Sequence, residues 1–459
     1  MSFDRGRGLA SRSLSAGYAW FQSAPQAVPA ILLLALLLRV AVIAAFPIQP
    51  HGDSLWYLHR ATEMARGLGF QEAGLPTAFW PVGYPALLGA AIALLGPSML
   101  APLLLNLVAA IATIMLIIWF ARRLGGGEAT ARIAALLYAI YPAHVVYAGD
   151  SAAEVTSTAV VMAGMALLVK GHGRFGLTLL AGIILGLATL MRPQFLLLAP
   201  VMLVPMSMTM RDFNARRAIK ALVVTGLGMA LVVLPWTARN LAMLHAPVMV
   251  STNGGIALQA GANSLTDGGY FQVEKSPLWA EVGIPFADRV RHQVEIDARL
   301  KAMAKRWIAE HPTQWFLLGF KKTFLLWARD TDAFWALDEN HPHMGTAWKA
   351  AQAINQLYYM LVMAGAVLGF AWAARETWRR GTPSTLLILA AMPVFCSALA
   401  FGFSGQTRYH FPAMPFLIIA TASVAARSLS RRGADQPRAT ESSMRHATTS
   451  DAGTLHATS

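Results

Sequence analysis

The sequence has little charge. Of its 459 residues only 13% are Asp, Glu, Lys or Arg, about half the share of roughly 25% that is usual in soluble domains. Hydrophobic residues make up 56% of the chain, and apolar runs such as 28–46 and 386–403 occur in it. These runs approach the ~20 residues that cross a bilayer. Composition therefore excludes a soluble enzyme and a disordered or fibrous chain, and it predicts an all-α polytopic integral membrane protein.

Cysteine is nearly absent as well. Cys396 is the single cysteine, so the chain forms no disulfide within itself. The patterns C-x-x-C and H-E-x-x-H, which hold redox centres or zinc, do not occur in the sequence. A prediction of function must therefore come from other residues.

The net charge of +14 lies on one side of the predicted topology. With both termini in the cytoplasm, the ten predicted spans are about 25–46, 98–120, 133–149, 154–169, 175–191, 194–210, 218–236, 351–373, 384–403 and 411–427. The inside segments then hold 20 Lys and Arg against 7 Asp and Glu, whereas the outside segments hold 16 against 16. This asymmetry follows the positive-inside rule, so it indicates membrane orientation and not a nucleic-acid surface.

Two outer segments are unusually long for a polytopic protein. The first outer loop covers about 47–97, and its residues 53–69 have a near-helical apolar spacing that predicts a helix on the membrane surface. The apolar stretch 86–95 is too short to cross the bilayer, so it predicts a second surface or re-entrant helix.

The second long segment is a large outer loop at about 237–350. It contains a charged amphipathic stretch at 286–310 and an apolar stretch at 315–327. If the apolar stretch crossed the membrane, it would bury Lys321 and Lys322 and would reverse the charge asymmetry. We therefore place it on the surface, which gives ten spans, with eleven as the alternative.

These segments divide the chain into five parts. They are a cytoplasmic N-terminal segment (1–24), a transmembrane core that includes the first outer loop (25–236), a large periplasmic loop with surface helices (237–350), C-terminal transmembrane helices (351–427) and a disordered cytoplasmic tail (428–459).

Asp53 follows the first span directly. A carboxylate at this place lies at the outer membrane interface, where it can act as a general base on a substrate. The alternative is an N-cap, because Asp followed by an amphipathic pattern is how many helices begin. The residues leave both interpretations open.

Asp150 and Glu154 stand at the next outer turn. Their spacing of four residues predicts that both lie on one helix face. Ionisable groups near membrane depth are costly and are often functional. The alternative is a cap at Asp150 and an interfacial carboxylate at Glu154.

Three arginines also fall at outer span ends, at positions 192, 239 and 408. If helix packing brings Arg192, Arg239 and Arg408 together, they form a clamp for a phosphate group. Each of them alone is also compatible with a snorkelling interface anchor. A positive charge is least favoured in the outer loops, which supports a shared function for the three.

Short motifs that contain these residues follow one another along residues 30–425. They are Asp53-Ser54-Leu55-Trp56-Tyr57-Leu58, Pro76-Thr77-Ala78, Pro81-Val82-Gly83-Tyr84-Pro85, Met191-Arg192-Pro193, Pro235-Trp236-Thr237-Ala238-Arg239-Asn240, Ser251-Thr252-Asn253-Gly254-Gly255 and Arg408-Tyr409-His410-Phe411-Pro412. The ordered set resembles the polyprenyl-phosphate-sugar-dependent glycosyltransferases of the GT-C fold. It is most similar to the bacterial family of lipopolysaccharide-core and lipid A sugar transferases, which is related to the protein O-mannosyltransferases.

This resemblance implies a GT-C-type membrane helix bundle with surface helices in the first outer loop. It implies an inverting transfer of a sugar from a polyprenyl-phosphate carrier to an acceptor hydroxyl. Asp53 matches the catalytic Asp of the family's first outer loop, and either Asp150 or Glu154 matches the acid of its second. We expect the three arginines to hold the donor phosphate, and we expect the site to be lined by His51, Tyr57, Tyr84 and Tyr409.

One difference from the motif of the related protein O-mannosyltransferases bears on the class of acceptor. Protein O-mannosyltransferases carry Asp-Glu in the first loop, whereas this chain has Asp53-Ser54. We therefore expect a lipid or cell-envelope glycan as acceptor, in a bacterial inner membrane with the site on the periplasmic face. No cofactor is certain, and a divalent cation between Asp53 and the acids at 150 and 154 is left open.

The competing class of function is a transporter or flippase for a glycolipid. It accounts for the spans and for the charges at membrane depth. It does not account for two large outer segments that carry acids and aromatic residues. The sequence also lacks a visible pair of broken helices in matching halves, which is the pattern of inverted-repeat transporters.

Overall fold

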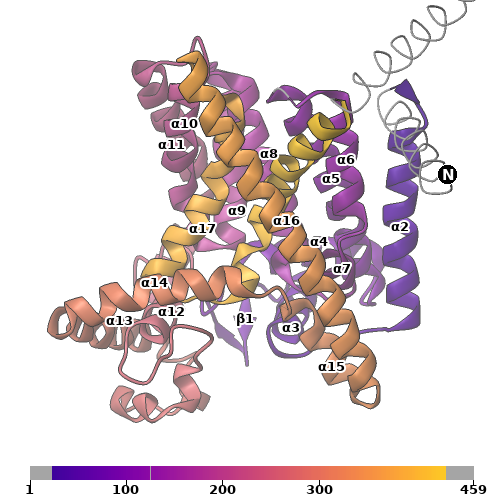
Figure 1. The fold of residues 1–459 in the computed structure, drawn as a ribbon. Coiled ribbons are helices and arrows are strands. Elements are labelled where there is room, and N and C mark those ends of the chain that lie inside the picture. Colours follow the sequence, from indigo (N-terminus) through magenta and orange to yellow (C-terminus); the bar gives the residue numbers. More distant parts are fainter. Residues whose placement is uncertain (1–22, 125, 431–459) are drawn as a thin grey trace, which may run out of the picture.

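A computed structural model shows the chain as an all-α bundle, with two short strands at one end (Figure 1). The structure describes residues 23–124 and 126–430. The predicted segment 1–24 lies almost wholly outside this part of the chain, and so does all but 428–430 of the predicted tail.

Within residues 23–124 and 126–430, seven helical segments are long and apolar enough to cross a membrane. They are Ala27–Ala45 (α2), Leu100–Arg123 (α5), Ala153–Gly171 (α8), Ala215–Leu244 (α11), Pro342–Arg380, which contains α16 (Gly345–Arg380), Thr385–Gly402, which contains α17 (Ala391–Gly402), and Thr407–Ser430. An eighth forms if the bent pair Gly127–Ala139 (α6) and Pro142–Gly149, which contains α7 (Pro142–Val146), is one span.

Two further apolar helical segments are shorter. They are α9 (Phe175–Met191) and Pro193–Thr209, which contains α10 (Leu198–Thr209). Each predicted span therefore overlaps an apolar helical segment, and the polytopic helix bundle is confirmed. The count of ten stays a prediction, because length and composition alone qualify seven or eight segments.

The outer-loop helices gather at one end of the bundle (Figure 1). The first outer loop forms α3 (Gly52–Ala65), the antiparallel strands β1 (Gln71–Glu72) and β2 (Leu75–Pro76), and α4 (Gly83–Leu95). The large loop forms α12 (Gly254–Gly261), α13 (Gln293–Glu310), α14 (Pro312–Ala328) and α15 (Trp335–Asn340). The short 3-10 turns are η1 (Tyr147–Gly149), η2 (Pro193–Leu197), η3 (Val273–Lys275), η4 (Pro277–Val282), η5 (Phe286–Asp288), η6 (Asp332–Phe334), η7 (Pro342–Met344), η8 (Thr385–Ala390) and η9 (Thr407–Ala413).

The helices that flank the large loop are longer than predicted. Helix α11 continues to Leu244 and α16 already begins at Gly345, so both cross the expected limits of 237 and 350. Lys322 on α14 is fully buried although this helix does not qualify as a span. The argument that a surface position keeps that ammonium in water is therefore wrong for Lys322.

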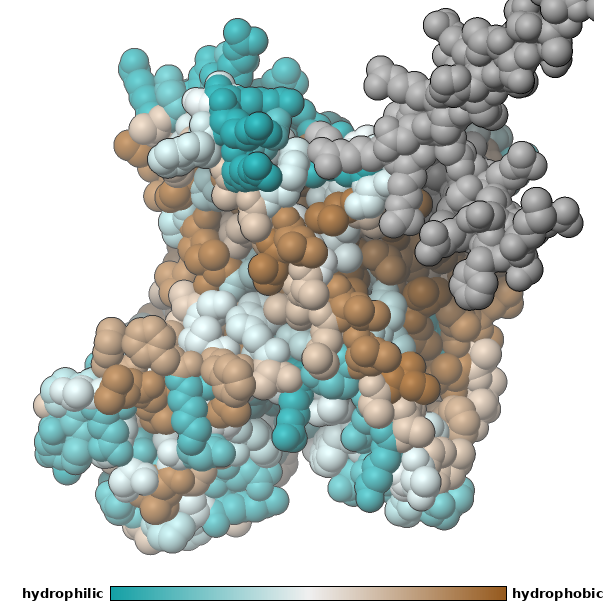
Figure 2. Space-filling model, in the orientation of Figure 1, coloured by the Kyte–Doolittle hydropathy of each residue, from teal (hydrophilic) through white to brown (hydrophobic). Residues whose placement is uncertain are grey.

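Hydropathy divides the visible face of the molecule into zones (Figure 2). Hydrophobic residues cover its middle, and hydrophilic residues dominate the end with the loop helices and the opposite end. Large apolar side chains on the span helices point outward, such as Val108 on α5, Leu231 on α11 and Leu361 on α16. This is the pattern of a bundle whose middle is surrounded by lipid.

Glycines set the packing around α9. A Cβ atom at Gly182 on α9 would overlap the carbonyl oxygen of Thr225 on α11, and one at Gly228 on α11 would overlap that of Leu179 on α9. A Cβ at Gly83, the first residue of α4, would lie 2.5 Å from the Leu190 carbonyl carbon near the end of α9. Small residues thus let α11 and α4 pack directly on α9, and they place the residue after α9 beside the first outer loop.

This packing predicts a position-specific response on one helix. Gly228→Ala should destabilise the protein by about 1–3 kcal/mol, because the new methyl group overfills the contact with α9. Gly226→Ala is the matched control, since a Cβ at Gly226 meets no atom within 4 Å. Thermal unfolding in detergent would measure both, and equal melting temperatures for the two variants would contradict the close contact.

Candidate active site

Two ion pairs lie at the end of the bundle where the loop helices gather. Arg408 Nη1 donates to Asp53 Oδ2 at 2.9 Å, and Arg192 Nη2 lies 2.5 Å from Glu154 Oε1. Asp53 comes from α3, Glu154 from the first turn of α8, Arg192 from the residue after α9 and Arg408 from η9. Segments that are far apart in the sequence thus bring four predicted site residues together in two pairs.

The two pairs differ in exposure. The side chains of Asp53 and Arg408 are 37% and 31% exposed, whereas those of Glu154 and Arg192 are 5% and 17% exposed. A molecule arriving from outside therefore meets the Asp53–Arg408 pair first. The Glu154–Arg192 pair lies deeper, and its charges are compensated mainly by each other.

Tyr57 connects the two pairs. Its phenol lies within electrostatic range of Asp53, Arg192, Glu154 and Arg408. Burial raises the pKa of Tyr57, and the Asp53 carboxylate raises it further. The phenol therefore keeps its proton at neutral pH and can donate a hydrogen bond within the site.

The start of α3 sets the position of Asp53. Gly52 adopts φ +52°, which a residue with a Cβ rarely accepts, and the chain turns there into the helix. The N-cap of α3 is His51, and no side chain caps this helix. The N-cap interpretation of Asp53 is therefore wrong, because its carboxylate is bound to Arg408 instead.

The expectation that Asp150 and Glu154 lie on one helix face is also wrong. Helix α8 begins only at Ala153, so Asp150 lies in the turn before it, and no side chain caps the helix. Asn106 fixes this turn, because its Nδ2 donates to the Asp150 carbonyl oxygen at 2.5 Å. Burial raises the pKa of the Asp150 carboxyl to about 6, while a hydrogen bond to Ser54 on α3 works in the opposite direction.

Arg239 has other partners. Its Nη1 donates to the Thr77 carbonyl oxygen at 2.9 Å and its Nη2 donates to that of Phe70 at 2.7 Å. The guanidinium also lies over the Trp236 ring, 4.8 Å from its centroid. These contacts bind the Arg239 side chain to the backbone of the first outer loop. The expected convergence with Arg192 and Arg408 is therefore not seen, because the backbone carbonyls on either side of the β-hairpin occupy its donors.

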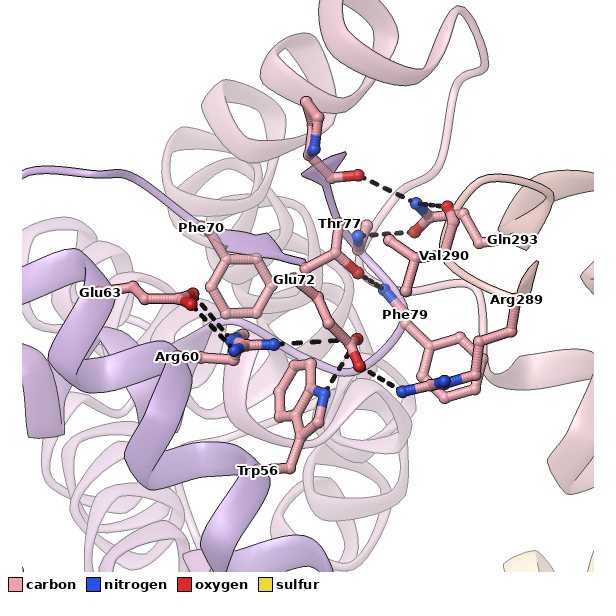
Figure 3. Close-up of polar contacts among 12 residues, drawn as sticks. Trp56, Arg60, Glu63, Phe70, Glu72, Thr77, Phe79, Arg289, Val290 and Gln293 are labelled. Carbon is pink, nitrogen blue, oxygen red and sulfur yellow. Dashed lines mark hydrogen bonds and ion pairs between the residues drawn. The ribbon is translucent and has the colours of Figure 1, made fainter. Parts of the chain in front are cut away.

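A second set of contacts holds the β-hairpin against the large loop (Figure 3). Glu72 on β1 accepts a hydrogen bond from Trp56 Nε1 at 3.0 Å and forms an ion pair with Arg289 of the large loop. The Ala78 N–H donates to Gln293 Oε1 at 2.7 Å. Trp56 directly precedes Tyr57 on α3, so these contacts also fix the helix that carries Asp53.

Besides Tyr57, three residues were expected to line the site, and each packs against a residue of the site or of its neighbouring helices. Tyr84 is fully buried and packs edge-on against Tyr57, with ring centroids 5.4 Å apart. The ring of Tyr409 lies beneath the guanidinium of Arg408, at 5.6 Å. His51 packs against Trp335 of α15, with ring centroids 4.4 Å apart.

The described part of the chain contains no preformed set of metal ligands. No group of three or more His, Cys, Asp or Glu side chains there is placed to hold a metal ion. A divalent cation between Asp53 and the second-loop acids therefore stays an open hypothesis.

Two acids that the sequence did not single out, Asp330 and Asp332, contact the segment that carries Arg408. Asp332 Oδ2 accepts a hydrogen bond from the Arg408 N–H at 2.8 Å, and Asp330 Oδ1 lies 3.2 Å from Nε2 of His410. The sequence does show a pair of acids there, in Asp330-Thr331-Asp332, three residues after the end of the apolar stretch of the large loop.

Comparisons with known proteins bear on the fold. No protein-family model and no curated protein sequence matches the chain. The oligosaccharyltransferase of Archaeoglobus fulgidus in complex with Zn and sulfate matches with a TM-score of 0.51 and 16% identity, over 88% of this chain and 50% of that chain. The same enzyme tethered with an acceptor peptide matches with a TM-score of 0.51 and 14% identity, over the same shares.

ArnT of Cupriavidus metallidurans bound to undecaprenyl phosphate matches less well. Its TM-score is 0.43 and its identity 16%, over 87% of this chain and 78% of that chain. The chain spans about half the length of the oligosaccharyltransferase that it matches. At these identities the likeness concerns the fold, and it confirms the GT-C-type helix bundle that the sequence motifs implied.

The environment of Asp150 predicts a pH-dependent stability difference. Its folded-state pKa of about 6 exceeds the ordinary 3.8, so the fold disfavours the ionised carboxylate, by roughly 1–3 kcal/mol once the pH exceeds both values. Asp150→Asn should therefore unfold at a higher temperature than the wild type near pH ~8. The difference should shrink as the pH falls towards ~4, where the wild-type carboxyl is increasingly protonated in both states. Thermal unfolding in detergent over this range measures it, and a gap independent of pH would contradict the burial.

Proposed function

We propose that this protein is a membrane glycosyltransferase that moves a sugar from a polyprenyl-phosphate carrier to an acceptor hydroxyl, with inversion at the anomeric carbon. The observation that carries the proposal is the half-exposed Asp53–Arg408 pair beside the buried Glu154–Arg192 pair. It combines an accessible carboxylate with two guanidinium groups, and it sits on a fold shared with an oligosaccharyltransferase.

The first step of the proposed reaction is an exchange of partners at Arg408. The phosphate of the donor competes with the Asp53 carboxylate for the guanidinium, and arginine binds phosphate well because its donors form a planar fork. The exchange leaves Asp53 without its ion-pair partner. A carboxylate released in this way is a stronger base than one held in an ion pair.

The chemical step then needs a base and a stabilised leaving group. Asp53 takes the proton of the acceptor hydroxyl, the hydroxyl oxygen forms a bond to the anomeric carbon, and the bond from that carbon to the phosphate oxygen breaks. The bonding electrons stay on the phosphate, whose negative charge increases. Arg408 and Arg192 supply fixed positive charge at the place where this charge develops.

An apolar groove is suited to the carrier chain. It has a volume of about 750 Å³ and lies among α14, α16, α17 and the last helix. Its lining includes Phe320, Trp327, Phe370 and Phe401. Trp327 also stacks on His410, with ring centroids 5.4 Å apart, and His410 is two residues from Arg408. A polyprenyl chain in this groove would therefore end near the arginine that we assign to its phosphate.

We further infer the acceptor and the membrane. The Asp53-Ser54 dipeptide favours a lipid or cell-envelope glycan over a protein, as the sequence resemblance implies. Helix α16 starts beside the loop helices and ends at the opposite end of the bundle with Arg379 and Arg380 (Figure 1). By the positive-inside rule the end with Asp53 is then the outer one, which corresponds to the periplasmic face of a bacterial inner membrane.

Replacing Asp53 tests the base. Asp53→Asn should lower sugar transfer by about 10²- to 10⁴-fold, because the amide cannot take the proton. Binding of a polyprenyl-phosphate sugar should persist or tighten, since Arg408 loses its competing carboxylate. Transfer is followed by mass spectrometry of the donor and acceptor lipids in nanodiscs. The control is Asp338→Asn, an exposed acid on α15. Near-normal transfer by Asp53→Asn would overturn the mechanism.

Two arginine variants separate phosphate binding from anchoring. Arg408→Gln should weaken donor binding about tenfold or more, because a charge-assisted contact to phosphate is lost. Arg239→Gln should lower the melting temperature with a smaller effect on donor affinity, because its partners are the carbonyls of Thr77 and Phe70. Donor titration and thermal unfolding of both variants test the assignment. Unchanged affinity in Arg408→Gln would count against it.

A further inference from the structure

His410 occupies a site in which both ring nitrogens face oxygen atoms. Its Nδ1 lies 2.7 Å from the Leu326 carbonyl oxygen and its Nε2 lies 3.2 Å from Asp330 Oδ1. A carbonyl oxygen only accepts hydrogen bonds, so Nδ1 must carry a proton. The charge state of the ring then depends on which group holds the proton between Nε2 and Asp330.

The other contacts of Asp330 bear on this question. Its Oδ2 accepts hydrogen bonds from the Tyr141 hydroxyl and from Asn355 Nδ2. Two donors on one carboxyl oxygen suit an ionised carboxylate, whose Oδ1 can then accept a hydrogen bond from Nε2. With the proton on Nε2, both ring nitrogens would be protonated and the ring would be an imidazolium.

The surroundings of the ring also suit a cation. Trp327 lies parallel to one face of it, with centroids 5.4 Å apart and planes 13° apart, and Tyr359 lies parallel to the ring at 5.3 Å and 20°. Aromatic faces attract cations, most strongly where water is excluded. His410 is only 1% exposed, so the carboxylate of Asp330 and the two rings replace the water that an imidazolium needs.

The same two segments meet again two residues earlier. The Arg408 N–H donates to Asp332 Oδ2 at 2.8 Å, so residues 330–332 contact residues 408–410 at two points. From this short turn, η9, the Arg408 side chain extends to Asp53.

We propose that His410 is a positioning residue, which as an imidazolium paired with Asp330 fixes η9 and thereby holds the Arg408 guanidinium where donor phosphate and Asp53 compete for it. This inference rests on the proposed function only in the identity of the ligand at Arg408. His410 itself does not touch the reacting atoms; it acts through the backbone that it shares with Arg408.

The first experiment measures the charge of the ring. Histidine labelled with ¹⁵N in the full-length protein in nanodiscs gives ring-nitrogen signals, and the signals absent from His410→Gln belong to His410. We expect two protonated nitrogens at neutral pH. One protonated and one bare nitrogen would overturn the ion pair, whatever the protein binds.

The second experiment measures coupling to Arg408, with polyprenyl monophosphate as the probe ligand. His410→Gln should weaken binding of this lipid about tenfold in the wild-type background, and it should cause no further loss in the Arg408→Gln background, because two residues acting through one contact are not additive. Thr421→Val is the matched control. Its hydroxyl donates to the Val362 carbonyl oxygen at 2.7 Å between the last helix and α16, and it should not alter the Arg408→Gln effect. If His410→Gln weakens lipid binding by the same factor in the Arg408→Gln background as in the wild type, the two residues act independently and the positioning role is rejected.

Two milder variants serve as controls for loss of folding. Breaking a buried ion pair is strongly destabilising, so the double variant Asp330→Asn with His410→Gln replaces both charges with amides that can pair. Tyr141→Phe removes only one hydrogen bond to the carboxylate. Both should fold and show an intermediate loss of lipid binding, and a wild-type affinity in both would contradict the proposal. If the wild type itself binds no polyprenyl phosphate, the proposed function fails, and the ¹⁵N spectrum still decides the ion pair.

Discussion

The structure depends on how charge is paired at the edge of an apolar bundle. Unpaired charges near membrane depth are costly, and at the end with the loop helices Asp53 pairs with Arg408 and Glu154 pairs with Arg192. The Asp53–Arg408 pair is half-exposed, so an anion from solution can reach it, whereas the Glu154–Arg192 pair is buried and is held by its own partners. In the mechanism that we propose, phosphate binding at Arg408 and release of the Asp53 base are one event.

The rest of the molecule supports this arrangement through packing at glycines and contacts at the backbone. Gly83 allows α4 to press against the end of α9, where Arg192 follows. The β-hairpin is held by Arg239 on one side and, through Glu72, by the large loop on the other. The two long outer segments thus contact each other beside α3, the helix that carries Asp53.

The sequence predicted much of this because hydropathy and charge are local properties. Apolar runs gave the helices, and the charges at outer span ends gave Asp53, Arg192 and Arg408. The sequence did not predict which residues of the folded chain contact each of these side chains. The position of Arg239 resembled that of Arg408, but only the folded hairpin shows the carbonyls that bind it. The spacing of Asp150 and Glu154 suggested one helix face, but α8 starts after Asp150. His410 was visible in a motif, yet its partner Asp330 lies 80 residues away.

The proposed function requires that a lipid-phosphate sugar is consumed at this site. The most direct measurement is mass spectrometry of both lipid pools after the purified protein, in nanodiscs, meets a panel of polyprenyl-phosphate sugars and membrane-extract acceptors. If the protein is a glycosyltransferase, one donor loses its sugar while an acceptor gains the corresponding mass. If every donor that binds is recovered intact, and in proteoliposomes is only moved between leaflets, the protein is a transporter and not a glycosyltransferase.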